Sequence, residues 1–293
     1  LAAGEQLRAQ VTQVPDERLV LEPSGRDTLP ALVLSMLTVL RTDPEAVVAV
    51  LTADHLIDPL ASVTATVADG CALAESSDDV LVTFGVVPDS PSTAFGYLET
   101  GEALQGDARV VLRFAEKPSL DRAEELVRQG ALWNSGMFVW RAATFLEAAR
   151  AFAPDVVEVV ERVAAGEPEA WQQVRRVSVD YGVMEPASTS DRFTVAALPL
   201  AARWIDVGSW PQYGDALGRD ADGNAVGAGT TALLDSRDCV IASSDPEHLV
   251  ALVGCEGLVV VHTPRATLVV PASQAQRVKD LHAVVAAHHE ELA

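Results

Sequence analysis

Several short polar segments hold residue types that could bind or transform a charged small molecule. These segments read EPSGRDT (22–28), ADH (53–55), FAEKP (114–118), WNSG (133–136) and WIDVGSW (204–210). Asp54, Glu116 and Asp206 bring carboxylates, Lys117 brings a cation, and Asn134 brings an amide that can both donate and accept. Each also has a structural explanation when taken singly: Asp54 as a helix cap, Glu116 and Lys117 as a surface pair, Asp206 as a turn former.

The WNSG segment poses the sharpest question, because it interrupts an otherwise strand-like apolar run, WNSGMFVWR (133–141). Asn134, Ser135 and Gly136 place an amide, a hydroxyl and a bare backbone near the start of this run. The structural interpretation is a turn that leads into a buried strand. A functional interpretation requires partners for these groups from elsewhere in the chain.

Predicted strands and helices position these polar segments. Apolar runs predict strands over 17–23, 45–55, 79–88, 108–114 and 193–200, and helices are predicted over 28–42 and 59–76. Their alternation indicates an α/β domain with a mostly parallel sheet. In such sheets ligands bind beyond the carboxyl ends of strands, which is where the polar segments fall.

Two finer expectations concern single elements. The run over 45–55 is apolar without alternation, so it is predicted to be a fully buried strand. Thr28 is expected to cap the helix over 28–42, with Pro30 in the first turn.

The texture of the sequence changes after Trp210. Short strands separated by turns predict a small all-β appendage, coiled or repeat-like, and an amphipathic helix follows over 275–292. The boundary is expected in the stretch 214–224, which is rich in Asp and Gly. The sequence thus predicts an α/β domain over 1–217 and a β-rich domain over 218–293.

Composition excludes several classes of protein. The 293 residues are 49% hydrophobic and 22% charged, as in an ordinary globular protein. A net charge of −21 argues against a nucleic-acid-binding surface, and an anionic substrate would need local cations, backbone N–H groups or a metal ion. No apolar run reaches the length that spans a bilayer, and no signal-peptide pattern opens the chain.

Cysteine and histidine usage points to neither a zinc site nor a disulfide framework. Cys71, Cys239 and Cys255 are scattered, so a reducing cytoplasmic location is expected. The six histidines show no metal-ligand spacing with acidic partners and are interpreted as surface or structural residues.

The order and wording of the motifs resemble one family, the mannose-1-phosphate guanylyltransferases of the sugar nucleotidyltransferase superfamily. The motifs are EPSGRDTLPA (22–31), ADHLI (53–57), TFGVVPDSPSTAFGYLE (83–99), FAEKP, WNSGMFVWR, SVDYGVMEP (178–186) and WIDVGSW. The resemblance implies a Rossmann-like, GT-A-like doubly wound sheet. It also implies transfer of GMP from GTP to mannose 1-phosphate, giving GDP-mannose and pyrophosphate.

The resemblance implies a role for each of the catalytic residues. Asp54 and Asp206 would hold Mg²⁺, and Lys117 would place its ammonium against the sugar phosphate. Glu116 and Asn134 would exchange hydrogen bonds with sugar hydroxyls. Because the attacking phosphate is already an anion, catalysis would be mainly alignment and neutralisation of negative charge.

Further substrate-binding residues follow from the same resemblance. Gly96 and Gly136 would let the backbone approach the sugar. Glu22 and Arg26, with Thr28, would belong to the nucleotide side, where a carboxylate can accept hydrogen bonds from guanine. A homo-oligomer is an open option.

The chain also departs from the family pattern. The glycine-rich loop G-G-x-G-T-R-L-W-P, which cradles the triphosphate, does not occur. The opening LAAGEQLRAQV (1–11) has the texture of a helix interior, so we expect a chain that is incomplete at its start. Smaller departures are Thr52, Ala94, Phe95 and Pro186, where the family usually has Pro, Gly, Tyr and Lys. No isomerase domain follows, which favours a single activity.

Two other functions stay open at this point. One is a non-catalytic sugar-nucleotide-binding or regulatory protein that has lost its phosphate loop. The other is a transferase for another hexose 1-phosphate or base. The upstream coding sequence would separate the first from an enzyme, and a substrate panel would decide the second.

Overall fold

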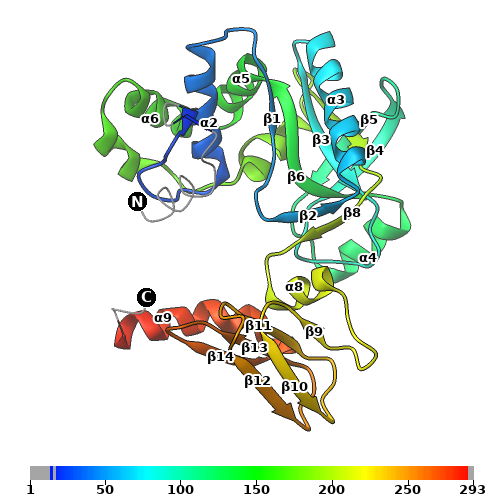
Figure 1. Cartoon of the computed structure of the whole chain (residues 1–293). Coiled ribbons are helices and arrows are strands. Elements are labelled where there is room, and N and C mark those ends of the chain that lie inside the picture. The colour runs from blue at the N-terminus through cyan, green and yellow to red at the C-terminus, as the bar shows by residue number, and fades with distance from the viewer. Residues whose placement is uncertain (1–13, 16–17, 290–293) are drawn as a thin grey trace. The chain divides into compact units, whose positions relative to one another are not determined.

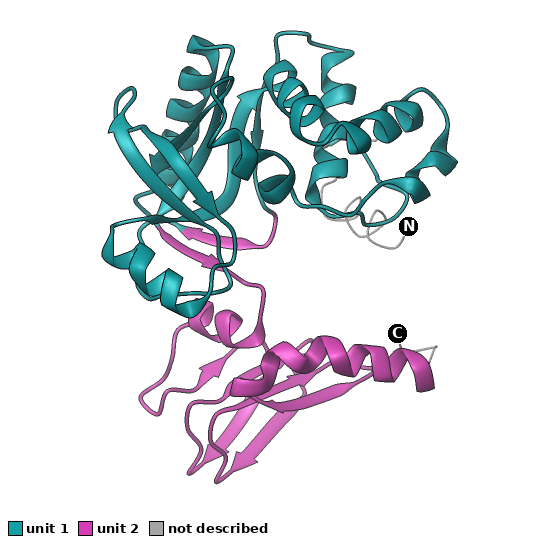
Figure 2. Cartoon of the chain, turned by 180° about the vertical axis from the view of Figure 1, so that it is seen from behind, with its two compact units in different colours: residues 1–52, 58–202 teal, residues 53–57, 203–293 magenta. Residues whose placement is uncertain are grey.

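The computed structural model describes residues 14–15 and 18–289 (Figure 1). The chain forms two compact units (Figure 2): unit 1 comprises residues 1–52 and 58–202, and unit 2 comprises residues 53–57 and 203–293. The helix interior expected over residues 1–11 lies outside the described residues. The predicted domain limit after residue 217 falls inside unit 2, because Trp210 and Tyr213 pack against the C-terminal strands.

Unit 1 is built on a six-stranded sheet with the order β1-β6-β3-β7-β5-β4. Its strands are β1 (Val47–Val50), β3 (Val80–Val86), β4 (Tyr97–Ala103), β5 (Arg109–Ala115), β6 (Leu132–Arg141) and β7 (Thr194–Pro199). Strands β5 and β6 run antiparallel to the other four, and β3 and β7 are parallel neighbours. The α/β class is confirmed, but the sheet is mixed rather than mostly parallel. The short turn between β4 and β5 is one cause, because a parallel pair needs a long crossover.

Helices cover both faces of this sheet. They are α2 (Thr28–Leu40), α3 (Leu60–Ser76), α4 (Leu120–Arg128), α5 (Ala142–Phe152), α6 (Pro154–Ala164) and α7 (Glu185–Ala187). On one face, Phe84 and Val139 lie against Gly70 of α3. On the other, Trp140 stacks between Phe138 and Phe145, with ring centroids 5.2 and 4.4 Å away, in the core shared with α2 and α6. Because successive side chains of β3 and β6 point to opposite faces of the sheet, these strands contribute to a hydrophobic core on each face.

Most predicted elements of unit 1 are confirmed. The helices over 28–42 and 59–76 and the strands over 79–88, 108–114 and 193–200 correspond to α2, α3, β3, β5 and β7 within a few residues. The strand predicted over 17–23 is wrong, because residues 18–27 form no strand. Val20 and Leu21 are exposed, and among the described residues no strand pairs with them.

The run over 45–55 is not one buried strand. It divides into β1 in unit 1 and the start of β2 (His55–Asp58), which pairs with β8 (Arg203–Asp206). Strand β1 is an edge strand, so Ala49 is exposed although its neighbours are apolar. Edge position therefore overrides the composition of the run.

The start of α2 also differs in detail from the prediction. Asp27, not Thr28, is the cap: its side chain accepts a hydrogen bond from Thr28 N at 2.8 Å, and its φ of 71° lies in the left-handed region. Thr28 instead accepts a hydrogen bond through Oγ1 from Val179 N at 2.9 Å. Pro30 lies in the first turn as predicted.

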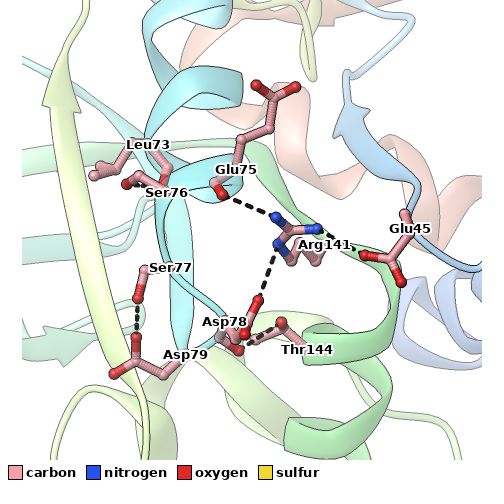
Figure 3. A network of polar contacts seen from close by, with 9 residues as sticks. All are labelled: Glu45, Leu73, Glu75, Ser76, Ser77, Asp78, Asp79, Arg141 and Thr144. Carbon is pink, nitrogen blue, oxygen red and sulfur yellow. Dashed lines mark hydrogen bonds and ion pairs between the residues drawn. The ribbon is translucent and has the colours of Figure 1, made fainter.

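The end of β6 is fixed by Arg141 (Figure 3). Its guanidinium donates to Glu75 O at 2.8 Å, and it lies 3.3 Å from Asp78 Oδ1 and 3.5 Å from Glu45 Oε2. Thr144 donates to the backbone carbonyl of Asp78 at 2.7 Å. The Arg141 side chain thus links the end of β6 to the C-terminal end of α3 and to the residues that precede β1 and β3.

Unit 2 contains a coiled stack of short strands, as the change of texture predicted. The strands are β9 (Ala225–Val226), β10 (Thr230–Leu234), β11 (Val240–Ser243), β12 (Leu249–Val253), β13 (Leu258–His262) and β14 (Thr267–Pro271). Thr230 pairs in parallel with Leu249 and Val240 with Val259, so these strand pairs are 259 − 240 = 19 residues apart, whereas Ala225 of β9 pairs with Val240 of β11 at a spacing of 240 − 225 = 15. Helix α8 (Trp210–Leu217) precedes the stack.

The corners of the coil repeat with the same spacing. Asp235 and Gly254 have positive φ angles of 49° and 63°, and Asp238 and Gly257 have 53° and 62°. Asp and Gly tolerate this left-handed backbone, which is why they alternate at equivalent corners.

The terminal helix begins later than predicted. A 3₁₀ turn over Ala272–Arg277 precedes α9 (Val278–His288), which buries none of its side chains. Leu281 and Val284 are exposed. No helix within residues 14–15 and 18–289 combines the length and apolar character needed to cross a membrane.

Candidate functional site

The polar break in β6 is a bulge within a continuous strand, not a turn before it. Across the β3–β6 pairing, Thr83 lies opposite Phe138 and Gly85 opposite Asn134, so β6 carries extra residues at this point. Gly136 sits in the bulge with a φ of 70°, and only a Thr52 methyl, at 3.9 Å, lies near its missing side chain. The bulge turns Asn134 inward and leaves Gly136 loosely packed among the described residues.

Asn134 is held from both sides. Its Oδ1 accepts a hydrogen bond from Thr83 Oγ1 at 2.8 Å, and its Nδ2 donates to Asp180 Oδ1 at 2.9 Å. Asn134 is 8% exposed and Thr83 is fully buried. Because a hydroxyl can donate to Oδ1 while a carboxylate can only accept from Nδ2, these partners define the orientation of the amide.

Asp180 opens a short π-helix, η3 (Asp180–Met184), in which Glu185 N donates to Asp180 O. Such π-turns occur frequently at functional sites. Desolvation by its neighbours and the charge of Glu116 together raise the pKa of Asp180 to about 6, although the residue keeps some exposed surface. The hydrogen bond from the backbone N–H of Asp180, the one from Asn134 and the charge of Lys117 oppose this rise but are smaller.

Glu116 and Lys117 follow directly after β5. Lys117 Nζ lies 3.1 Å from Glu116 Oε1, and the side chains of Lys117 and Glu116 are 58% and 8% exposed, respectively. The hydrogen bond to Glu116 raises the pKa of Lys117, so the ammonium is fully charged at neutral pH. Lys117 has a φ of 45°, a conformation that side-chain-bearing residues seldom adopt outside functional sites and tight turns.

Gly96 has a packing reason as well as the expected ligand-facing one. A Cβ here would collide with Glu116 Oε2 and lie 3.1 Å from Phe114 Cε1. The Gly96 carbonyl accepts a hydrogen bond from Asn134 N at 2.8 Å. Gly96 thus lets the Glu116 carboxylate approach the strand that carries Asn134.

The segment over 22–28 lies at the start of α2. Glu22 is exposed, whereas Arg26 donates to Gln172 O at 3.0 Å and has a buried Nε that lacks a hydrogen-bond partner. The Thr28–Val179 hydrogen bond joins this segment to the residue next to Asp180. The structure therefore links Thr28, but not Glu22, to the cluster around Asn134.

In unit 2, Asp54 and Asp206 flank His55. Trp204 Nε1 donates to His55 Nδ1 at 3.0 Å, so the ring proton of neutral His55 lies on Nε2, which is 3.9 Å from Asp206 Oδ1. Burial lowers the pKa of His55, and the charges of Asp206 and Asp54 oppose this effect. His55 is therefore neutral at pH 7 and leaves both carboxylates uncompensated.

The donor set of Asp54 and Asp206 suits a hard divalent cation. Neither carboxylate has a Lys or Arg ion pair within the described part of the chain. Those residues also contain no group of three or more His, Cys, Asp and Glu side chains arranged to hold a metal. Magnesium needs no such cage, because it binds through one or two carboxylates together with substrate phosphates.

The structure thus brings the sequence-predicted residues into two groups. Gly96, Glu116, Lys117 and Asn134 share one cluster in unit 1, with Gly136 in the bulge beside it. Asp54 and Asp206 share another in unit 2.

Sequence reasoning missed Thr83, Asp180 and His55 as members of these clusters. All three fall inside quoted motifs: Thr83 in TFGVVPDSPSTAFGYLE, Asp180 in SVDYGVMEP and His55 in ADHLI. The motif wording was therefore the available signal, but no pattern indicated that Asp180 would meet Asn134.

Comparisons with known proteins identify two families along the chain. A model of the nucleotidyl transferase family matches residues 2–223, and one described as a MannoseP isomerase/GMP-like beta-helix domain matches residues 229–284. The second match covers the coiled strands of unit 2.

Similar proteins carry the name expected from the motifs. Mannose-1-phosphate guanylyltransferase of Escherichia coli (strain K12) is 37% identical over 94% of this chain and 59% of that protein. The Klebsiella pneumoniae protein of the same name is 36% identical over 94% and 59%. The chain therefore spans about three fifths of the length of these curated relatives.

A solved structure adds a match in three dimensions. It is described as mannose-1-phosphate geranyltransferase from Thermus thermophilus and has a TM-score of 0.82 and 30% identity. The match covers 96% of this chain and 88% of that one. The predicted resemblance and the nucleotidyltransferase fold are confirmed.

Asp180→Asn is expected to stabilise the protein at neutral pH. Because the pKa of Asp180 is raised to about 6, the folded protein binds more protons than the unfolded chain between roughly pH 4 and 6, so wild-type stability falls as pH rises through that window. Asparagine can still accept from Asn134 and carries no charge. Denaturant unfolding at pH 7.5 should show a gain of at most about 3 kcal/mol.

The matched control is Asp107→Asn, an exposed carboxylate in the turn between β4 and β5. It should leave the pH dependence of wild type intact. A lower unfolding free energy for Asp180→Asn at pH 7.5 would show that the charge of Asp180 stabilises the fold.

Proposed function

The chain belongs to the nucleotidyl transferase family, and from this premise we propose that its protein transfers GMP from GTP to mannose 1-phosphate. The products are GDP-mannose and pyrophosphate. The names of the relatives at 36–37% identity support this choice of nucleotide and sugar.

The observation that carries the proposal is the cluster in unit 1. An exposed ammonium on Lys117 lies beside Glu116 and the Asn134–Asp180 pair. One cation for a phosphate next to several acceptors for hydroxyls is the chemistry of a sugar phosphate site. Gly136 has no side chain, so its backbone could approach a ligand closely.

In the proposed reaction, a phosphate oxygen of mannose 1-phosphate attacks the α-phosphorus of GTP. The new P–O bond forms as the bond between the α-phosphorus and the bridging oxygen of pyrophosphate breaks. The nucleophile is already ionised, so no residue must remove a proton. Lys117 lowers the repulsion between the two phosphates, and Glu116 orients the sugar through its hydroxyls.

Asp54 and Asp206 would hold a magnesium ion, which supplies neutralisation of phosphate charge when bound. Within unit 2, His55 contributes no positive charge because burial keeps it neutral. The carboxylates therefore retain their full attraction for a cation.

We further expect the protein to work in the cytoplasm, without a nucleic-acid or membrane partner. A net charge of −21 disfavours contact with nucleic acids and anionic lipids. Cys71, Cys239 and Cys255 are free thiols, in keeping with a reducing compartment. A homo-oligomer stays a prediction.

A substrate panel tests the activity. Pyrophosphate release from the purified protein should be highest with GTP and mannose 1-phosphate among combinations of four nucleotides with mannose, glucose and galactose 1-phosphates. A preference for ATP, UTP or dTTP, or for glucose 1-phosphate, would contradict the assignment. Absence of turnover with every pair, together with tight GDP-mannose binding, would favour a binding protein.

Asp206→Asn is expected to remove most of the activity and leave the fold intact. The substitution keeps the shape of the side chain but deletes one of the two charges that would hold Mg²⁺. Turnover should fall by about 100-fold or more, and the magnesium concentration for half-maximal rate should rise.

Asp280→Asn, an exposed position at the start of α9, is the control and should behave like wild type. Turnover of Asp206→Asn within a few-fold of wild type at saturating Mg²⁺ would make Asp206 a turn residue only.

Lys117→Ala is expected to weaken use of mannose 1-phosphate more than binding of GTP. The lost charge-assisted hydrogen bond is worth about 1.5–3 kcal/mol, so kcat/KM for the sugar phosphate should fall by roughly 10- to 150-fold. GTP affinity, measured by calorimetry, should change little.

The only other lysine, Lys279, provides the matched control as Lys279→Ala. Equal losses for both substrates in Lys117→Ala would assign Lys117 to the triphosphate or to the fold.

A further inference from the structure

Asp180 carries a charge for which the fold of unit 1 offers little compensation. Its carboxylate receives a hydrogen bond from its own backbone N–H and one side-chain hydrogen bond, from Asn134, and the nearby carboxylate of Glu116 repels it. The ammonium of Lys117 pairs with Glu116 at 3.1 Å and acts on Asp180 more weakly than the desolvation does. A desolvated charge without a close cation is costly unless a ligand completes its surroundings.

The architecture around Asp180 nevertheless requires only an oxygen acceptor. Asn134 Nδ2 would find the same acceptor in an asparagine or serine side chain at position 180. The backbone of Asp180 is held independently, because its carbonyl accepts from Glu185 N and the adjacent Val179 N donates to Thr28. Packing and backbone geometry therefore leave the negative charge unexplained.

The surroundings indicate what kind of group the carboxylate meets. Two neighbouring carboxylates, Glu116 and Asp180, would repel a phosphate, and Lys117 is the cation beside them. Neutral donors suit the carboxylates, and the hydroxyls of a sugar are such donors. The part of Asp180 that stays accessible leaves it reachable by a ligand.

We infer that Asp180 is a sugar-binding residue whose carboxylate accepts a hydrogen bond from a hydroxyl of the hexose phosphate, with Thr83 and Asn134 holding it in place. This inference rests on the proposed function and deepens it. Asn134 is then mainly a positioning residue, since Thr83 occupies its Oδ1 and Asp180 its Nδ2. One Nδ2 hydrogen and one Oδ1 lone pair remain for other contacts.

The test is steady-state kinetics of Asp180→Asn with mannose 1-phosphate and with its 2-, 3- and 4-deoxy analogues. The KM for mannose 1-phosphate should rise at least 10-fold, while the KM for GTP should stay within threefold of wild type. One deoxy analogue, the one that lacks the contacted hydroxyl, should be used about equally by wild type and variant. A purely structural role would penalise all four sugars alike.

Two further variants serve as a control and as an alternative substitution at position 180. Asp107→Asn is the exposed control and should match wild type with every sugar. Asp180→Ser keeps an oxygen for Asn134 and should repeat the selective rise in KM if Asp180→Asn folds poorly.

The outcomes separate this inference from the proposed function. If wild type turns over mannose 1-phosphate and the variants keep their KM for it within twofold, Asp180 does not bind the sugar although the function stands. A uniform loss with all four sugars also overturns the inference. If wild type turns over no hexose 1-phosphate, the proposed function itself fails, and the inference fails with it.

Discussion

The side-chain amide of Asn134 is the interaction on which the unit 1 cluster depends. The amide accepts a hydrogen bond from Thr83 on β3 and donates one to Asp180 on η3. The backbone N–H of Asn134 donates to the carbonyl of Gly96, directly before β4. Asn134, on β6, therefore links three strands and a π-helix. A bulge is required to turn it inward, and Gly136 supplies the left-handed backbone for that bulge. The amide that interrupts an apolar strand is therefore a buried link between elements, not a break in a core.

Strand pairing decides which elements of unit 1 the sequence predicts correctly. Strand β3 and most of β7 are buried and apolar, and β5 keeps enough apolar residues around Arg109 and Arg113 for its hydrophobic pattern to predict it as well. Strand β1 has similar composition but lies at the sheet edge, and residues 19–21 are apolar but pair with no strand among the described residues. Pairing partners decide both cases, and a single-sequence pattern carries no information on pairing.

The same limit applies to the site. The predicted residues Glu116, Lys117 and Asn134 fall together, because motif wording carries family information. The contact between Asn134 and Asp180 spans 180 − 134 = 46 residues and depends on a π-turn, which has no sequence signature of its own. The neutral state of His55 depends likewise on burial and on Trp204, far away in the chain. Desolvation and long-range hydrogen bonds are properties of the folded chain, and sequence spacing does not reveal them.

The small number of positively charged side chains limits how this protein could neutralise a phosphate substrate. The chain has 21 Lys and Arg against 42 Asp and Glu, and many described arginines are already paired with carboxylates. These arginines are Arg122, Arg141, Arg150, Arg162, Arg175, Arg192, Arg219 and Arg237.

Lys117 is also paired, but its ammonium is more than half exposed and lies at the rim of the cluster, so a phosphate can share it with Glu116. A polyphosphate brings more negative charge than one ammonium can offset, so the proposed activity would require a further source of positive charge. An acidic protein can thus handle an anionic substrate by recruiting positive charge with the substrate instead of storing it in its own side chains.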